Sequence, residues 1–538
     1  MLKTKIIEHL KKTISTNLLL DPAEIEPEVF TPDNEKFGHY STNVALKLAK
    51  NLKKNPLEIA HQINSELKNS KIFSKIEVAS PGFINFWLKP ELLQKELKEI
   101  LKKKKNYGQP KAKSSKLKTV NIEFISANPT GQLTIGNGRG GFLGDALANL
   151  LEFSGFKVTR EYYINDAKAS NQIKELGKTA LGKGETYKTS YLQKKIKLIK
   201  KELQGKSESE AGYLLAQEVM KDIKNFITKR LKIKFDVWFS EESLYQKKAI
   251  DKLLEKLEKK GLIYKKEGAI WFKTAQFGDT ENRVLIRKTG EPTYFLSDLA
   301  YFLNKLEGRK FNKIINIWGA DHHGYELRLR AALKALGIAD DKFKAIITQM
   351  VRLVKEGKEI KMSKRKGEYF TLEELIKEIG LDATRFFFLM YSPDTHMDFD
   401  LGLAKKKSMK NPVYYVQYAA VRCQSIIKKI SKSKLLISQQ IPKNEILKFL
   451  NTAEDLDLIR MLVRFPEKIE EATTNYNPQV IIRYSLDLAK KFHNFYEKEK
   501  VITENQKTTF ARLILIKSTL IVFQNIFSIL GISLPKKM

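Results

Sequence analysis

Between residues 119 and 351, short apolar runs alternate with longer amphipathic runs. In the first short run, Val120, Ile122 and Phe124 alternate with polar residues, and this period of two is typical of a β-strand. The next run places leucines at helical spacing. Strands that alternate with helices predict a doubly wound parallel sheet of the Rossmann-like α/β class. The strand-like runs cover residues 119–124, 157–164, 313–318 and 345–351.

The last quarter of the chain has a different pattern. After Gly402 there is no glycine until Gly531. The pairs Asn411-Pro412 and Asn477-Pro478 have the form of a helix N-cap followed by proline at the first helical position. Long amphipathic runs follow both pairs, so we predict an all-α helical bundle at residues 405–538.

The remaining sequence divides around the predicted sheet. Residues 1–110 mix helix-like and strand-like segments, which predicts an α+β domain. A lysine-rich connector at 101–118 follows, and we interpret it as a solvated linker in preference to a binding arm. We place the sheet domain at 116–400, with a Lys/Glu-rich helical insertion near 168–235 and further strands at 236–297 that decorate the sheet.

The composition is strongly basic: 97 Lys and Arg stand against 62 Asp and Glu, a formal charge of +35 over 538 residues. Codon bias alone can enrich lysine, but an excess of this size favours a polyanionic partner, most simply nucleic acid. The single Cys423 excludes an intramolecular disulfide and any multi-cysteine zinc site. The apolar stretch 513–532 contains Lys517 and Gln524, so we predict a buried helix and no membrane span. Because the N-terminus lacks a signal-peptide pattern, we expect a cytoplasmic protein.

Residues with unusual chemistry follow each predicted strand. In doubly wound sheets, ligands bind outside the carboxyl ends of the strands. The glycine-rich stretch 126–141 joins the first strand to a helix N-terminus, where backbone N–H groups and the helix dipole favour an anionic phosphate. Taken alone, an ordinary tight loop explains that stretch equally well. However, Asn165-Asp166 follows the second strand, 319–324 the third, and the fourth leads to Lys361–Arg365, so four such stretches face one crevice.

These stretches resemble the signature motifs of arginyl-tRNA synthetases, a class I aminoacyl-tRNA synthetase family. The resemblance extends in collinear order over nearly the whole chain. It implies ATP-dependent activation of arginine to arginyl-adenylate and transfer to the 3′-terminal adenosine of tRNA(Arg), with release of AMP and pyrophosphate. The matching blocks are FGHYSTNVAL (37–46), ANPTGQLTIGNGRG (127–140), EYYIND (161–166), WGADHHGY (318–325), KMSKRKG (361–367), DATRFFF (382–388), DTHMDFD (394–400) and NPVYYVQY (411–418).

One tetrad departs from the family pattern. The family usually has histidine at both ends of it, where this chain has Thr134 and Asn137. Threonine and asparagine still donate hydrogen bonds to phosphate, although neither becomes cationic. The same Thr-Ile-Gly-Asn tetrad resembles that of bacterial tryptophanyl-tRNA synthetases, so we interpret it as a tolerated substitution and not as an inactivated site. We assign Thr134, Asn137, Lys361 and Lys364 as catalytic residues. Cations placed over the triphosphate stabilise the leaving pyrophosphate. For the two lysines, a surface lysine cluster is the alternative interpretation.

The resemblance also implies the substrate contacts. A guanidinium is best matched by carboxylates, and Glu123 and Asp298 match the family's guanidinium-binding acids. The expected arginine-binding residues are Glu123, Ser126, Asn128, Tyr294, Asp298 and His322. The expected ATP-binding residues are Gly131, Gly136, Gly138, Gly319, Asp321, Met350 and Val351.

Cofactors and partners follow from the same resemblance. Mg²⁺ would accompany ATP as part of the substrate complex. Adjacent His322 and His323 suggest a metal site, but no cysteine or carboxylate pattern completes it, so we expect no protein-bound zinc. We expect a monomer whose N-terminal domain binds the tRNA elbow and whose helical domain binds the anticodon stem-loop. Two alternatives stay open, a synthetase of different specificity, for instance for tryptophan, and a non-catalytic tRNA-binding paralogue.

Overall fold

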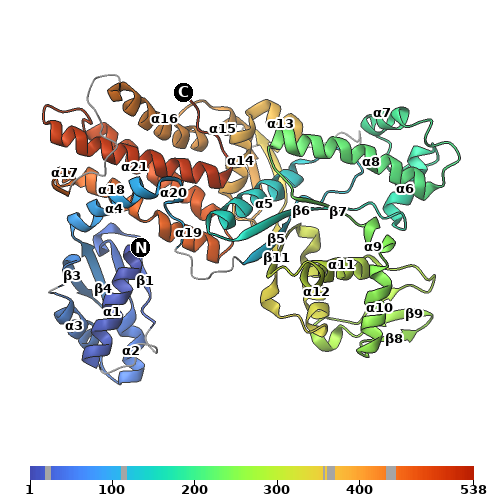
Figure 1. Cartoon of the computed structure of the whole chain (residues 1–538), viewed down its shortest axis with the longest axis horizontal. Helices are drawn as coiled ribbons and strands as arrows, with labels where there is room; N and C mark the ends of the chain where they lie inside the picture. Colours follow the sequence, from blue (N-terminus) through green and yellow to red (C-terminus); the bar gives the residue numbers. More distant parts are fainter. Residues whose placement is uncertain (19–25, 69, 111–117, 356–357, 360–369, 432–443) are drawn as a thin grey trace.

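The structure is a computed structural model that describes residues 1–18, 26–68, 70–110, 118–355, 358–359, 370–431 and 444–538. Lys361 and Lys364, which we predict to be catalytic, therefore lie outside the described residues. Figure 1 shows an N-terminal α+β region, a central sheet with helices on both sides, and a C-terminal group of long helices. The predicted multidomain fold class is thus confirmed.

The N-terminal region is a four-stranded antiparallel sheet, in the order β1-β2-β4-β3, with helices packed on it. Asn55 caps α3, since its side chain accepts the Leu57 N–H, and Pro56 takes the first helical position. Helix α4 leaves the sheet and packs against α18 and α21 of the C-terminal region. The elements are α1 (Leu2–Leu18), β1 (Val29–Phe30), η1 (Glu35–Phe37), β2 (Tyr40–Thr42), α2 (Val44–Leu52), α3 (Pro56–Leu67), β3 (Phe73–Ala79), β4 (Phe83–Leu88), α4 (Pro90–Lys103) and η2 (Lys104–Asn106).

The central sheet is five-stranded and parallel, in the order β12-β11-β5-β6-β7. Four of these strands are the predicted ones, but the fourth was predicted to run to Val351 and ends at Thr348; a new strand starts at Val351. The strand predicted near 235–239 does not decorate the sheet: it is the fifth member. The strands are β5 (Thr119–Glu123), β6 (Lys157–Ile164), β7 (Val237–Ser240), β11 (Lys313–Gly319) and β12 (Phe343–Thr348).

Both faces of this sheet are buried, as expected for a doubly wound fold. Along β11, Ile315 and Ile317 belong to a core shared with α5 and the C-terminal helices. The preceding Ile314, which points to the opposite face, belongs to a second core, formed with α10, α11 and α12. The helices and strands of this second side are α9 (Glu242–Gln246), α10 (Ala249–Lys259), β8 (Ile263–Lys266), β9 (Ala269–Phe272), η4 (Ala275–Phe277), β10 (Arg283–Ile286), α11 (Tyr294–Leu303), η5 (Asn304–Gly308), η6 (Ala320–His322), α12 (His323–Ala335) and η7 (Asp340–Lys342).

The predicted insertion is helical and lies to one side of the sheet (Figure 1). Helices α6 and α8 cross at Gly177 and Gly212, where a Cβ atom on either residue would lie within 2 Å of a backbone oxygen of the other helix. Only glycine permits this close approach. The elements are α6 (Asn171–Ala180), α7 (Ser190–Leu198), α8 (Glu208–Phe226) and η3 (Ile227–Leu231).

The C-terminal region is all helical, as predicted. Asn411 accepts the N–H of Val413 directly before α16, so the first predicted N-cap is confirmed. Asn477 accepts the N–H of Gln479, but α20 begins at Gln479 with Pro478 as its N-cap, one residue later than predicted. The predicted buried apolar helix is α21, the one helix among the described residues that is long and apolar enough to cross a membrane; 78% of that window is buried inside the protein. The helices are α16 (Pro412–Ser431), α17 (Asn444–Leu447), α18 (Ala453–Val463), α19 (Phe465–Thr474), α20 (Gln479–Lys498) and α21 (Gln506–Leu530).

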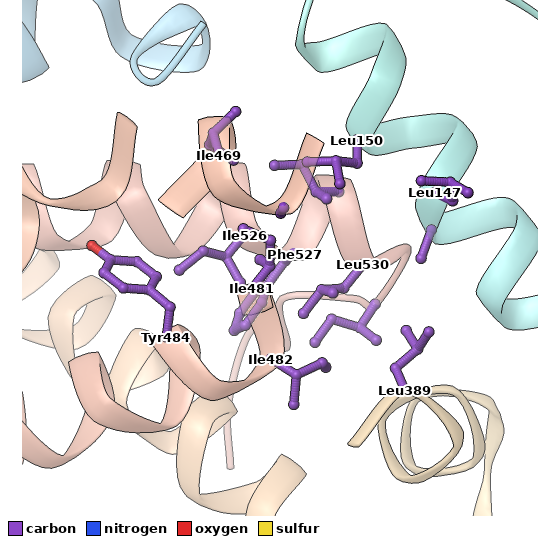
Figure 2. Packing of buried hydrophobic residues seen from close by; sticks show 14 of the residues in the cluster. Leu147, Leu150, Leu389, Ile469, Ile481, Ile482, Tyr484, Ile526, Phe527 and Leu530 are labelled. Atoms are coloured by element: carbon purple, nitrogen blue, oxygen red, sulfur yellow. The ribbon is translucent and has the colours of Figure 1, made fainter. Parts of the chain in front are cut away.

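Helix α5 (Ile135–Phe153) connects the sheet to the C-terminal helices. Its leucines Leu147 and Leu150 pack against side chains of α14, α19, α20 and α21 (Figure 2). A second link is the guanidinium of Arg385 in α14, whose side chain is 1% exposed. It pairs with Asp145 of α5 at 2.7 Å and donates to the carbonyls of Leu231 and Leu530 at 3.1 and 3.4 Å. The segments between the sheet and the C-terminal helices are β13 (Val351–Lys355), β14 (Lys358–Glu359), α13 (Leu372–Ile379), α14 (Leu381–Met390), β15 (Met397–Asp400) and α15 (Leu401–Lys405).

Candidate active site

The candidate site lies at the carboxyl ends of the central strands, where the strand order reverses between β5 and β11. The loop that leaves β5 has two residues other than glycine at positive φ, Ile125 (66°) and Ser126 (37°). Such backbone conformations cost energy and cluster at functional sites. Asn165, after β6, donates to the Ser126 carbonyl at 3.2 Å, so the loops after two neighbouring strands are tied together.

The glycine-rich loop ends at the N-terminus of α5. Thr134 is the N-cap, and the side-chain oxygen of Asn137 accepts both its N–H (2.9 Å) and its hydroxyl (3.0 Å). Thr134 and Gly136 are exposed, so the free N–H groups of the first helical turn are accessible to an anion. Gly138 is buried, and a Cβ there would lie 2.6 Å from a methyl carbon of Leu372. Gly131 has open space around it.

Helix α13 docks on the same loop. The N–H of Leu372 donates to the Leu133 carbonyl at 3.0 Å, and Thr371 forms a β-bridge with Thr134. The segment that carries Lys361 and Lys364 precedes this contact in the chain and lies outside the described residues. The contact therefore holds Thr371 and Leu372 beside the residues at the start of α5.

Arg139, in the second turn of α5, organises two loops of the site. Its guanidinium is 2% exposed and donates to four backbone carbonyls. Those of Gln349 (2.8 Å) and Met350 (3.4 Å) belong to the turn after β12. Those of Ser392 (2.7 Å) and Thr395 (2.8 Å) belong to the loop before β15. Met350, which is 69% exposed, and Val351, the first residue of β13, are predicted to contact ATP. The hydrogen bonds from Arg139 therefore fix the turn that carries Met350 and leads to Val351.

The predicted residues after β11 lie at the rim of the site. Gly319 ends the strand, and its missing side chain leaves room for the Asp321 carboxylate, whose oxygen would lie 2.6 Å from a Cβ. Asp321 and His322 are both exposed, and the His322 ring lies against Trp318 and Tyr325. Among the described residues, no group of three or more His, Cys, Asp or Glu is arranged to hold a metal ion.

Three carboxyl groups gather on the other side of the loop. Glu123 ends β5 and is buried; Asp298, in α11, accepts the hydroxyl of Tyr325; Glu241 follows β7, is 3% exposed and accepts the hydroxyl of Ser297 at 3.1 Å. Glu123, Glu241 and Asp298 form what we call the acidic cluster. Ser126 joins it by donating to Glu123 at 3.3 Å.

The protonation of the acidic cluster is shifted in the free protein. Burial, reinforced by Asp298, raises the pKa of Glu241 to about 8. Burial also raises the pKa of Asp298 to about 6, although its hydrogen bond with Tyr325 opposes the shift. Strongly shifted carboxyl groups in a crevice mark a functional site, and these two favour a cationic ligand that restores their charge.

Two predicted arginine contacts, Asn128 and Tyr294, are exposed at the entrance to the crevice, with Tyr294 52% exposed.

The sequence interpretation missed Glu241. The available signal was its position directly after the strand near 235–239, but that strand was assigned to the periphery. Asp166, which was noted only as a polar residue after β6, positions Glu241: it accepts the Ser240 hydroxyl (2.8 Å) and the Glu242 N–H (3.1 Å) on either side.

A second region of interest lies between α16 and α20. The rings of Tyr414 and Tyr418 stack with centroids 6.1 Å apart, and His493 stacks on Tyr418 at 5.9 Å. The Arg422 guanidinium lies 5.1 Å from the Tyr418 ring and 5.2 Å from that of Tyr496. We call these five residues the ring strip. Of its rings, Tyr496 is exposed and the other three are half-buried. Accessible aromatic rings beside a cation are the kind of surface on which unpaired nucleobases stack.

Comparison with known families accounts for the whole architecture. Residues 1–88 match the arginyl tRNA synthetase N terminal domain. Residues 96–174 and 167–387 match the catalytic domain of class I (R) tRNA synthetases. Residues 416–538 match the DALR anticodon binding domain. The three matches follow the three regions seen in the structure.

Individual relatives agree. The chain is 41% identical to an arginine–tRNA ligase of Listeria monocytogenes serotype 4b (strain F2365), covering 99% of this chain and 98% of the relative. It is 40% identical to that of Bacillus subtilis (strain 168), covering 100% and 99%. The fold is similar to the solved arginyl-tRNA synthetases of Thermus thermophilus (TM-score 0.76, 21% identity, 100% of both chains) and Plasmodium falciparum (TM-score 0.79, 19% identity, 100% and 99%). The chain therefore belongs to the family of arginyl-tRNA synthetases.

Proposed function

We propose that this chain is an arginine–tRNA ligase whose acidic cluster binds the guanidinium of arginine and whose α5 N-terminus binds the phosphates of ATP. The observation that carries this assignment is the juxtaposition of the two chemistries at one edge of the sheet. Glu123 ends β5, and the loop that begins at the next residues leads directly to the exposed N-terminus of α5. A cationic side chain and a polyanion are thereby held on opposite sides of one loop.

The residue roles follow from this arrangement. Glu123, Glu241 and Asp298 recognise the guanidinium, with Ser126 and Tyr294 at the pocket and Asn128 and His322 toward the amino-acid end. Gly131, Gly136 and Gly138 give the triphosphate close access to the backbone. Gly319 and Asp321 contact the ribose, and Met350 and Val351 the adenine.

The reaction needs alignment and charge neutralisation but no covalent enzyme intermediate. A carboxylate oxygen of arginine attacks the α-phosphorus of ATP, and the bond from that phosphorus to pyrophosphate breaks. Asn137, Lys361 and Lys364 stabilise the departing pyrophosphate, which leaves with Mg²⁺, while Thr134 caps the helix that carries Asn137. The ribose hydroxyl of the terminal adenosine, the 2′-hydroxyl in class I enzymes, then attacks the carbonyl carbon of arginyl-adenylate, and AMP leaves.

The tRNA partner spans the molecule in this proposal. The N-terminal domain (1–110) binds the elbow, the catalytic domain (116–400) the acceptor end, and the helical domain (405–538) the anticodon stem-loop, with the ring strip receiving unpaired anticodon bases. The charge of +35 supports a strongly salt-dependent interaction. The proposed enzyme is a cytoplasmic monomer without protein-bound zinc.

Arginine-dependent exchange of pyrophosphate into ATP, with and without tRNA, tests the proposal. We expect exchange with arginine that depends on bound tRNA, and none with tryptophan, because an indole would leave the acidic cluster uncompensated. Exchange with tryptophan and none with arginine would establish a related synthetase with tryptophan specificity. No exchange with any amino acid in the presence of tRNA, together with retained tRNA binding, would establish a non-catalytic paralogue.

A further inference from the structure

A lysine ammonium is buried next to the acidic cluster. Lys305 is fully buried, with no exposed surface, and its Nζ lies 2.5 Å from Oε2 of Glu123. The same ammonium lies 4.1 Å from the ring centroid of Tyr301 and 5.4 Å from that of Phe302. Lys305 stands in η5, a π-helical turn that continues α11, the helix that carries Tyr294 and Asp298 at its other end. One continuous stretch of helix therefore supplies both an acid and a cation to this site.

The contacts of Glu123 divide between its two oxygens. Oε2 accepts from Lys305 and from the Asn316 side chain at 3.1 Å; Asn316 is the register partner of Glu123 across β5 and β11. Oε1 accepts only the weak 3.3 Å contact from Ser126 among the described residues. A carboxylate has about four acceptor positions, so Oε1 keeps capacity for a further donor. The lysine thus holds one oxygen and leaves the other for a ligand.

Stability alone does not explain this ion pair. Burying two charges costs several kcal/mol, and well-packed apolar residues of similar volume are often at least as stabilising. π-Helical turns are rare and occur frequently at functional sites. The pair stands at the acid that ends β5, in the crevice where the loops of the site meet, which points to a role in binding and not in packing.

We propose that Lys305 is a positioning residue for arginine recognition: it fixes the Glu123 carboxylate so that Oε1 receives the substrate guanidinium. This inference rests on the proposed function, in which Glu123 binds arginine. Lys305 itself does not contact arginine and acts through Glu123. Its positive charge also favours the ionised forms of Glu123 and Asp298 before the substrate arrives.

The chain offers a matched control. Arg309, one helical turn further on, pairs with Glu161 of β6, the register partner of Glu123 on the other side of β5. Glu161 has both oxygens occupied, by Arg309, Asn121 and Tyr301, and thus leaves no oxygen for a ligand. Loss of Arg309, whose side chain is 26% exposed, leaves the buried carboxylate of Glu161 without its cation, outside the acidic cluster.

The test is steady-state tRNA charging by the full chain, with thermal unfolding measured in parallel. We expect Lys305→Met to raise KM for arginine about tenfold or more and to leave KM for ATP within about twofold, because only arginine uses Glu123. Lys305→Arg, which keeps the cation, recovers most of the loss. Arg309→Met lowers Tm by at least as much as Lys305→Met but leaves KM for arginine within about twofold of the parent value. If Lys305→Met does not fold, Lys305→Gln, which keeps one donor, and Lys305→Arg provide the same comparison.

A double-mutant cycle with Glu123→Gln separates the possible failures. If Lys305 acts through Glu123, Lys305→Met adds no more than about a twofold change in the Glu123→Gln background. If Glu123→Gln raises KM for arginine but Lys305→Met does not, Lys305 has no positioning role and the proposed arginine site stands. If Glu123→Gln leaves KM for arginine unchanged, the assignment of Glu123 itself fails. Equal effects of Lys305→Met and Arg309→Met on all kinetic constants would reduce Lys305 to a structural residue.

Discussion

Thr134 and Asn137 are joined twice through one atom, because Oδ1 of Asn137 accepts both the N–H and the hydroxyl of Thr134. A backbone N–H needs an acceptor, so this contact fixes the amide orientation and turns Nδ2 of Asn137 outward as a donor. The hydroxyl proton of Thr134 is already used within the pair. Of the two residues that replace the family's histidines, Asn137 is therefore the one that keeps a donor for a phosphate, while Thr134 serves as the cap.

Asn137→Asp isolates that donor. The aspartate still accepts from Thr134 and favours a helix N-terminus, so we expect Tm to be kept or raised. It replaces the Nδ2 donor by an anionic oxygen, so kcat for pyrophosphate exchange falls at least about a hundredfold. Asn137→Ala, the comparison, loses both cap and donor and lowers Tm as well as kcat. Retained exchange activity in Asn137→Asp would show that Asn137 does not contact the phosphates.

Asp298→Ala removes an acid from the proposed guanidinium site. Because the substrate cation would lose its partner, we expect arginine charging to fall by more than about a hundredfold while the fold is retained. A charging assay measures the activity, calorimetry measures arginine binding, and circular dichroism checks that the fold is retained. The control is Glu291→Gln, a change in the segment just before Asp298. It removes a surface carboxylate that pairs with Lys174 of α6, and we expect it to leave the affinity for arginine unchanged. Near-normal arginine affinity in Asp298→Ala would remove this residue from the site.

The shifted pKa of Glu241 makes stability depend on pH. The folded protein holds this proton up to pH about 8, whereas the unfolded chain releases it near the usual value of 4.5. Between these values the folded state binds one proton more, so stability falls as pH rises, by about 1.4 kcal/mol per unit for this group. Asp298 adds a similar slope between its usual 3.8 and about 6. We expect Tm of the free enzyme to decrease from pH 6 to pH 8.

The control for this effect is Glu241→Gln, which mimics the neutral acid and flattens the slope between pH 6 and 8. Arginine binding ionises the cluster, so calorimetry at pH 7 in two buffers of different ionisation enthalpy registers proton release by the wild-type protein and less by the variant. A Tm that stays constant from pH 6 to 8 would contradict the assigned protonation.

Arg139→Met tests the support of the adenine side. Four carbonyls lose their donor, and the turn that carries Met350 is freed from the loop at Ser392–Thr395. We expect KM for ATP to rise about tenfold or more, since each charged hydrogen bond contributes roughly 1.5–3 kcal/mol. Arg139→Lys keeps the charge but not the forked geometry, so its KM for ATP lies between that of the parent protein and that of Arg139→Met. An unchanged KM for ATP in a folded Arg139→Met variant would show that the turn that carries Met350 does not contribute to nucleotide binding.

Tyr418→Ala tests the ring strip. Base stacking on an aromatic side chain contributes about 1–3 kcal/mol, so KM for tRNA rises roughly fivefold to a hundredfold while KM for arginine and ATP stays constant. Tyr418→Phe keeps the ring and is the control, with tRNA affinity close to the parent value. If both variants bind tRNA normally, the strip is a packing feature of the two helices.

Much of the fold was predictable from residue patterns. The alternation along Val120, Ile122 and Phe124 and the leucine spacing that follows are local signals, and they identified β5 and α5. The cap at Asn411 is local too, because an Asn side chain and a proline together decide where a helix starts.

The rest depended on contacts that sequence spacing does not record. Strand β7 has four residues, all of them half-buried, so its pattern does not distinguish a sheet edge from a peripheral hairpin. Its place in the sheet, and hence that of Glu241, depends on pairing with β6. Lys305 gave no signal either, since one lysine among 97 Lys and Arg is unremarkable until its ammonium is seen without solvent.

The guanidinium of Arg385 bears on how this protein is divided. It contacts Asp145 of α5, Leu231 at the end of η3, and Leu530 at the end of α21. Gly531, which follows that turn, has φ of 66°, and a Cβ there would lie 2.1 Å from the same guanidinium. A cut placed between residues 400 and 405 would remove Leu530 and the apolar side chains of α21 from around the ion pair of Arg385 with Asp145, and would so expose this buried pair to solvent. The border between the two domains is a border of sequence pattern and not of packing, so neither half is a module that can be excised intact.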